Sequence, residues 1–144
     1  MTVLTVAEHR GGRLRDVSRE LQTAGRELAA STGEAVHTAV VGGDTDRLAR
    51  RLATEGVDVV HAVAGGDEFN HDVHAAALSR LASAVDATVV LVPHTATGLD
   101  YAPALAVRLD WPVVTDAVAL DAADGLTATR RVGGSWTRLA VDGG

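Results

Sequence analysis

The sequence predicts an α/β fold, a three-layer sandwich in which a mostly parallel, doubly wound sheet carries helices on both faces and antiparallel strands follow at the C-terminal end. Short apolar runs alternate with stretches whose apolar residues recur at helical spacing as far as Leu109. Beyond Asp116 the runs are short and turn signals separate them. Because 144 residues suffice for one core, we expect residues 1–144 to form a single domain.

Four apolar runs predict the parallel strands. They cover residues 3–7, 35–43, 57–63 and 88–93. The last run is apolar at consecutive positions, which is typical of a central strand covered on both faces. Val113 and Val114 predict the start of a fifth strand.

Helices are predicted between these strands, with Asp16, Asp44 and Asn70 as the N-caps of the first three. In the fourth helix, Thr97 and Asp100 have the spacing of a capping box, and Pro103 fits the first turn. Trp111 and Pro112 stop this helix. The expected buried stripes are Val17, Leu21, Ala24 and Leu28; Leu48, Leu52 and Ala53; Val73, Ala77, Leu81 and Ala84; and Ala102, Leu105, Ala106 and Leu109.

Turn signals at Asp124-Gly125 and Gly133-Gly134 predict two or three antiparallel strands at the C-terminal end. Such a hairpin would place Arg131 opposite Trp136. The two are either a cation–π pair or, the interpretation that we favour, ordinary strand residues.

The composition excludes several function classes. All 13 basic residues are Arg and face 19 acidic residues, so the net charge of −6 disfavours nucleic acid as a partner. The absence of Cys excludes disulfides and thiolate sites. No run approaches the roughly 20 apolar residues of a membrane span, and the first residues lack the pattern of a signal peptide, so we expect a cytoplasmic protein.

Two Gly-Gly-Asp turns follow predicted strands, Gly42-Gly43-Asp44 and Gly65-Gly66-Asp67. Their position suits a phosphate cradle, because helix N-termini bind anions at the carboxyl ends of parallel strands. Neither forms GxGxxG, and each puts a carboxylate where a phosphate would lie. Tight turns with an N-cap Asp are the favoured interpretation.

The stretch "DEFNHDVHA" supplies candidate metal ligands in Asp67, Glu68, His71, Asp72 and His74. His71 and His74 would share one helix face. No HExxH pattern is present, so we favour a solvated acidic helix start and predict no metal site.

No catalytic residue is predicted, because no Ser lies in a GxSxG elbow. His37 and His61 fall inside strands, where packed neutral side chains are expected. His9 and His94 follow strand ends and are candidates to line a cleft.

The turn after residues 88–93 is the strongest candidate site. Thr95, Thr97, Gly98 and Asp100, next to His94, are the predicted cofactor-binding residues, since hydroxyls, a Gly and free helix amides suit an anion or a ribose. The alternative is a capping turn that only orders the helix.

The sequence resembles the N-terminal domain of electron transfer flavoprotein alpha subunits. The resemblance spans nearly the whole chain and is most specific in "HTATGLDYAPALAVRLDWPVVTDAVAL", with support from "TVLTVAEH" and "TRRVGGSW". Two positions depart from the family, because Leu99 and Ala104 stand where it usually has Arg. The family pattern falls on Thr95, Gly98, Asp100, Ala102-Pro103, residues 106–109, Thr115-Asp116, Arg130 or Arg131, and Gly133-Gly134.

The resemblance implies a scaffold domain, related to adenine-nucleotide-binding α/β folds, that docks a beta-type subunit of an electron carrier. It implies FAD at the level of the complex, held mainly by a C-terminal domain outside these 144 residues, and no catalytic residue here. Two alternative functions stay open: a small nucleotide-binding module that takes AMP or ATP at the Gly42 and Thr95 turns, and a metal-dependent enzyme built on His71 and His74. Besides the beta-type subunit, a second copy of the chain stays open as a partner, in a homo-oligomer.

Overall fold

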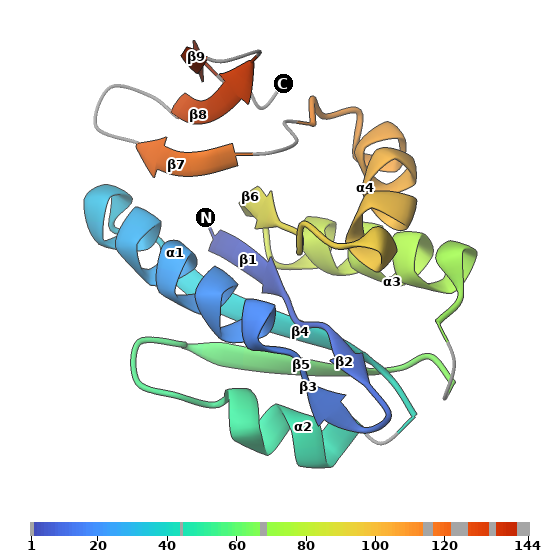
Figure 1. Cartoon of the computed structure of the whole chain (residues 1–144). Helices are drawn as coiled ribbons and strands as arrows, with labels where there is room; N and C mark the ends of the chain where they lie inside the picture. Colours follow the sequence, from blue (N-terminus) through green and yellow to red (C-terminus); the bar gives the residue numbers. More distant parts are fainter. Residues whose placement is uncertain are drawn as a thin grey trace.

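The computed structural model describes residues 2–43, 45–66 and 69–113 with their side chains, and residues 117–121, 127–132 and 135–140 as backbone. The elements alternate as predicted, and the α/β class is confirmed (Figure 1). The helices are α1 (Asp16–Thr32), α2 (Thr45–Leu52), α3 (His71–Ala84) and α4 (Ala96–Leu109). The strands are β1 (Thr2–Val6), β2 (His9–Arg10), β3 (Arg13–Leu14), β4 (Ala35–Gly42), β5 (Val59–Ala64), β6 (Ala87–Leu91), β7 (Ala117–Asp121), β8 (Thr127–Val132) and β9 (Ser135–Ala140).

Four parallel strands form the central sheet in the order β5-β4-β1-β6. Successive side chains of a strand point to opposite faces, so β1 supplies both cores. Val3 packs with Leu28 of α1, and Leu4 packs with Leu78 of α3 and Leu105 of α4. The helix α2 covers β4 on the α1 side. The three-layer sandwich is therefore present.

The interior strands are β4 and β1, and the run at residues 88–93 is not one of them. Every residue of β1 is buried, whereas β6 is one of the two edge strands in the described part of the sheet. Its Val89 and Leu91 pack on the α1 side, and Val90 packs on the α3–α4 side. A continuous apolar run indicates that helices cover both faces of a strand. It does not indicate whether the strand has a neighbouring strand on both edges.

The start and buried face of α1 differ from the prediction. Arg15 occupies the N-cap without a side-chain hydrogen bond, and Asp16 is the first helical residue. The buried residues include Ser18, Gln22 and Gly25 besides Leu28. Gln22 is buried because its amide donates hydrogen bonds to the Thr38 hydroxyl at 3.1 Å and to the Leu52 carbonyl at 2.9 Å.

The two later caps had different outcomes. Asn70 is confirmed as the N-cap of α3, where its side chain accepts from the Val73 amide. In α4 the N-cap is Thr95, not Thr97, and Pro103 lies inside the helix. Thr95 takes the cap because its hydroxyl accepts the Gly98 amide at 3.1 Å. Asp44 lies outside the described residues.

A short hairpin, β2–β3, was not predicted. Its turn is Gly11-Gly12, and both glycines have positive φ, 58° and 75°, as a tight two-residue turn requires. The glycine pair between His9-Arg10 and Arg13-Leu14 was the available signal.

The C-terminal strands form a separate antiparallel sheet in the order β7-β8-β9. The sequence predicted two or three antiparallel strands, and three are present. Arg131 is paired with Trp136 in register. The predicted start of a fifth strand is wrong at Val113, which belongs to no strand, and the next strand, β7, pairs antiparallel with β8. Val114, Thr115, Asp116, Asp124-Gly125 and Gly133-Gly134 lie outside the described residues. Among the helices described, none combines the length and apolar character needed to cross a bilayer.

Candidate functional site

The candidate site lies where β1 and β6 end side by side. The chain leaves β1 through α1 and α2 toward one edge of the sheet, and returns through α3 to the opposite edge as β6. Doubly wound sheets bind ligands at such a reversal of strand order, next to the carboxyl ends of the strands. The segments that meet there are Ala7-Glu8 after β1 and residues 92–95 after β6.

Glu8 occupies the middle of this position and is only 8% exposed. The Thr95 hydroxyl donates to its carboxylate at 2.5 Å, and the Arg15 guanidinium lies 3.3 Å from the second carboxylate oxygen. The Ser18 hydroxyl donates to the Glu8 carbonyl at 2.9 Å and accepts the Glu8 amide at 2.8 Å. The backbone of Glu8 is thereby fixed to the start of α1, and its carboxylate to the start of α4.

The turn between β6 and α4 requires glycine at position 98. A Cβ on Gly98 would lie 1.9 Å from the carbonyl oxygen of Pro93. No side chain fits at that distance, so the close approach of the helix to the strand end depends on Gly98. The approach lets the Thr95 hydroxyl accept the Gly98 amide while it donates to Glu8.

An aromatic cluster of Phe69, His74 and Tyr101 lies at the starts of α3 and α4. The rings of Phe69 and Tyr101 lie 4.8 Å and 5.3 Å from that of His74. Burial lowers the pKa of His74, so the imidazole is neutral at neutral pH. Burial, with a smaller contribution from the Glu8 charge, raises the pKa of the Tyr101 phenol, which stays protonated.

The two candidate metal ligands His71 and His74 turn to different partners. The ring of His71 faces Asp100, with 3.2 Å between its Nδ1 and the carboxylate, whereas His74 belongs to the aromatic cluster. Within the residues that the structure describes, no three His or acidic side chains are placed to hold a metal ion together. Asp67 and Glu68 lie outside those residues.

The first Gly-Gly turn is packed against a histidine. A Cβ on Gly42 would lie 2.5 Å from Nε2 of His9, which is 2.8 Å from the Val41 carbonyl. His9 therefore covers the end of β4. In the second turn, a Cβ on Gly65 would meet Val41 at 2.5 Å. Both glycines are explained by close packing.

His37 and His61 form a pair on neighbouring strands, away from the strand ends. Nδ1 of His37 lies 2.9 Å from Nε2 of His61. Burial lowers the pKa of both rings, and the proximity of His37 lowers that of His61 further. Both are packed neutral side chains, as the sequence predicted.

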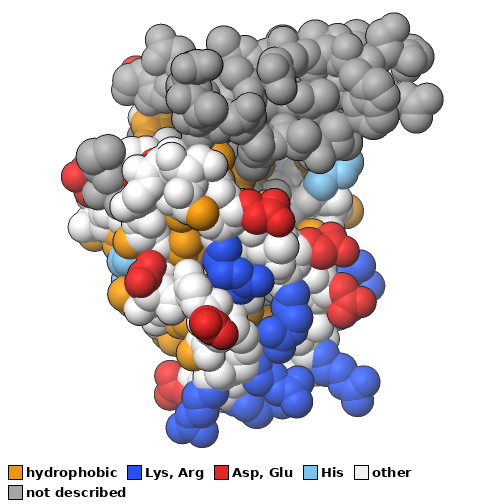
Figure 2. Space-filling model, turned by 90° about the vertical axis from the view of Figure 1, so that its left-hand side faces the viewer, with side chains coloured by type: hydrophobic (Ala, Val, Ile, Leu, Met, Phe, Trp, Pro, Cys, Tyr) orange, Lys and Arg blue, Asp and Glu red, His pale blue; other side chains and the backbone are white. Residues whose placement is uncertain are grey.

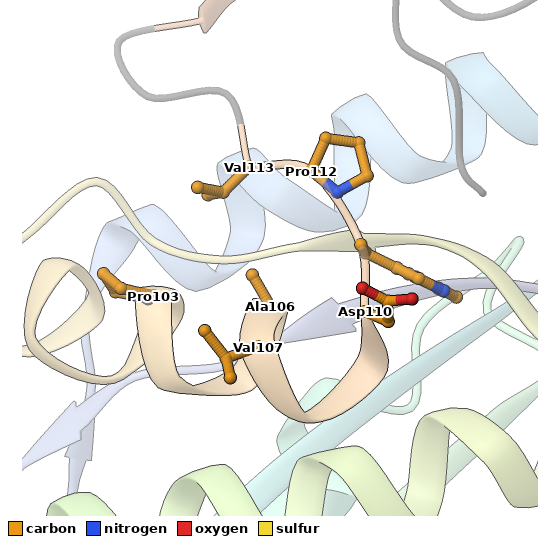
Figure 3. Close-up of a pocket in the computed structure, with 7 residues that line it drawn as sticks. Pro103, Ala106, Val107, Asp110, Pro112 and Val113 are labelled. Atoms are coloured by element: carbon orange, nitrogen blue, oxygen red, sulfur yellow. The ribbon is translucent and has the colours of Figure 1, made fainter.

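A groove of about 520 Å³ lies at the far end of α4 (Figure 3). The Asp110 carboxylate is the charged group in a lining that is otherwise apolar, so the groove does not suit an anion. It is separate from the strand ends. Its lining residues are Pro103, Ala106, Val107, Asp110, Trp111, Pro112 and Val113.

The structure brings together two of the four predicted site residues, Thr95 and Gly98, through the capping hydrogen bond. Thr97 follows in the first turn of α4, and Asp100 turns toward His71 of α3. Sequence reasoning missed Glu8. Its signal was an acidic residue directly after the first strand, at the place where the order of strands reverses.

Comparisons with known proteins place these features in a family. The family described as electron transfer flavoprotein domain matches residues 3–140. The chain is 38% identical over 130 residues to the electron transfer flavoprotein subunit alpha of Methylophilus methylotrophus, covering 89% of this chain and 40% of that protein. It is 32% identical over 117 residues to the same subunit of Thermoanaerobacterium thermosaccharolyticum, covering 80% and 36%.

A fungal protein is also similar. The probable mitochondrial electron transfer flavoprotein subunit alpha of Cryptococcus neoformans var. grubii is 33% identical over 135 residues, which cover 90% of this chain and 37% of that protein. The chain thus spans about 40% of the length of such relatives.

Proposed function

Since the chain belongs to the electron transfer flavoprotein family, as a domain of the alpha-subunit type, we propose that it is the scaffold that docks a beta-type subunit in a flavin electron carrier. In this proposal FAD is bound by the complex, outside residues 1–144, and the domain works in the cytoplasm. Electrons pass between the flavin and a redox partner, so no acid or base is required of this chain.

The observation that carries the proposal is an exposed apolar surface beside the strand ends. Phe69, Val73 and Leu99 are 41%, 37% and 42% exposed, and we call them the apolar docking surface. They lie at the starts of α3 and α4, which His71 and Asp100 connect. Large exposed apolar side chains on neighbouring helix starts are a common feature of protein interfaces.

The neighbouring strand ends support docking rather than a large ligand. Glu8 already occupies the position at the start of α4 where an anion would bind, and Thr95 and Arg15 hold it there. Leu99 also stands where the resemblance leads us to expect Arg, which makes this surface less polar.

Co-expression with the beta-type subunit from the same genome tests the proposal. We expect one complex in size-exclusion chromatography, and its loss in Phe69→Glu/Leu99→Glu, because the two added charges would be desolvated in the interface. The control is Val107→Glu, since Val107 is 81% exposed on another part of α4. The proposal would be overturned if the wild-type chain eluted without the beta-type subunit, either as a monomer or as a homo-oligomer.

A second candidate, an AMP-binding module, is favoured by the position of Thr95 and Gly98 at a helix start beside the strand reversal. A phosphate could enter only by displacing the Glu8 carboxylate. Calorimetric titration with AMP tests this function, and Glu8→Gln should then strengthen binding. Flat titrations of both proteins would remove the candidate.

A further inference from the structure

Arginine side chains are concentrated on one end of an acidic protein. Residues 8–20 and 45–52 hold seven arginines and four acidic residues, a net charge of +3. The rest of the chain holds six arginines and fifteen acidic residues, a net charge of −9. The seven are all exposed, and we call them the arginine surface: Arg10, Arg13, Arg15, Arg19, Arg47, Arg50 and Arg51.

The tertiary fold brings these residues together from three elements. Arg47 of α2 donates to the Gly12 carbonyl in the turn of the β2–β3 hairpin. Arg19 of α1 reaches the Arg51 carbonyl of α2 at 3.4 Å. Figure 2 shows Arg side chains gathered over the lower part of the molecule, the part that holds α2 in Figure 1.

The arrangement has an electrostatic cost. Arg10 and Arg13 are directly opposite each other in the hairpin, where like charges are unfavourable. Arg47, Arg50 and Arg51 share α2 at spacings of three and four residues, which again brings like charges together. A patch that is locally repulsive gains stability when an anionic surface covers it.

We propose that the arginine surface docks an acidic protein surface, a role that is independent of the proposed beta-type interface on the α3–α4 side. The planar guanidinium fork fits carboxylates in a bidentate manner. A long nucleic acid would meet the −9 charge of the remaining chain. A membrane is disfavoured because the large exposed apolar residues of the described part lie outside this surface.

Anisotropy of a fluorescent oligoglutamate peptide, titrated with the full chain at an ionic strength of about 20 mM, tests the proposal. We expect saturable binding that weakens about tenfold or more at about 150 mM. Arg13→Glu/Arg50→Glu should weaken it about tenfold. The control, Arg80→Glu/Arg108→Glu, makes the same change in net charge on exposed residues elsewhere and should stay within about twofold of wild type.

Several results would overturn the proposal. The first is the absence of saturable peptide binding at low salt. The second is an equal loss of peptide binding in Arg80→Glu/Arg108→Glu, and the third is tighter binding of a single-stranded DNA that has the same charge as the peptide. Sedimentation measures whether the chain associates with itself. Self-association that disappears in Arg13→Glu/Arg50→Glu would identify a second copy of the chain as the occupant of the arginine surface. If circular dichroism shows that this variant is unfolded, Arg13→Gln/Arg50→Gln replaces it, with a smaller loss of binding expected.

Discussion

The single hydroxyl of Thr95 makes two hydrogen bonds in the candidate site. It donates to the buried Glu8 carboxylate and caps α4 by accepting the Gly98 amide. We expect Thr95→Val to lower the free energy of unfolding by about 1–3 kcal/mol, because both partners lose a hydrogen bond. Urea denaturation measures this, with Thr95→Ser as the matched control that keeps the hydroxyl. Equal stability of the Val and Ser variants would contradict the account.

Gly98 provides a second test of the turn between β6 and α4. In Gly98→Ala the new methyl group would collide with the Pro93 carbonyl, so we expect a loss of at least about 2 kcal/mol in unfolding free energy. Gly33→Ala is the comparison, since Gly33 has a φ of 74° but open space around it, and should cost only about 1 kcal/mol. Thermal unfolding of both variants decides whether close approach matters more than backbone conformation at these turns.

The paired histidines make a prediction for the sheet. Burial lowers the pKa of His37 and His61 below the ordinary value of 6.5. The unfolded chain therefore binds more protons as pH falls below about 6.5, so this contribution to stability is present above that pH and lost below it. We expect the urea midpoint to fall between pH 7 and pH 5, and to fall less in His61→Gln. The same fall in both proteins would show that the pair does not titrate in this way.

The sequence predicted every strand and helix of the parallel unit, because alternation of apolar runs and helical stripes is a strong local signal. The predicted stripe of α3 was wrong at Val73 and Ala84, which are exposed, because the buried face runs through Ala75, Leu78 and Ala82. The exact residue at which each helix begins was harder to predict from the sequence. Thr95 and Thr97 are chemically equivalent cap candidates, and only the tertiary contact with Glu8 distinguishes them. The polar inner face of α1 was missed for the same reason, since the partners of Gln22 lie in β4 and after α2.

The order of the strands in the sheet could not be predicted from the strand patterns, so β6 was expected at the centre of the sheet, whereas it lies at an edge. The site is similarly non-local, since Glu8 and Thr95 are 87 residues apart in sequence. The resemblance to alpha subunits identified the family, and its most specific stretch contains the turn between β6 and α4. It did not indicate that a carboxylate from the other end of the chain fills that turn.

In the proposed function, the starts of α3 and α4, rather than any reactive side chain, form the surface that binds the beta-type subunit. Hydrogen exchange of the chain alone and in complex with the beta-type subunit tests it most directly. We expect protection from exchange to be concentrated in residues 69–74 and 95–101. Protection confined to the opposite face, over α1 and α2, would contradict it.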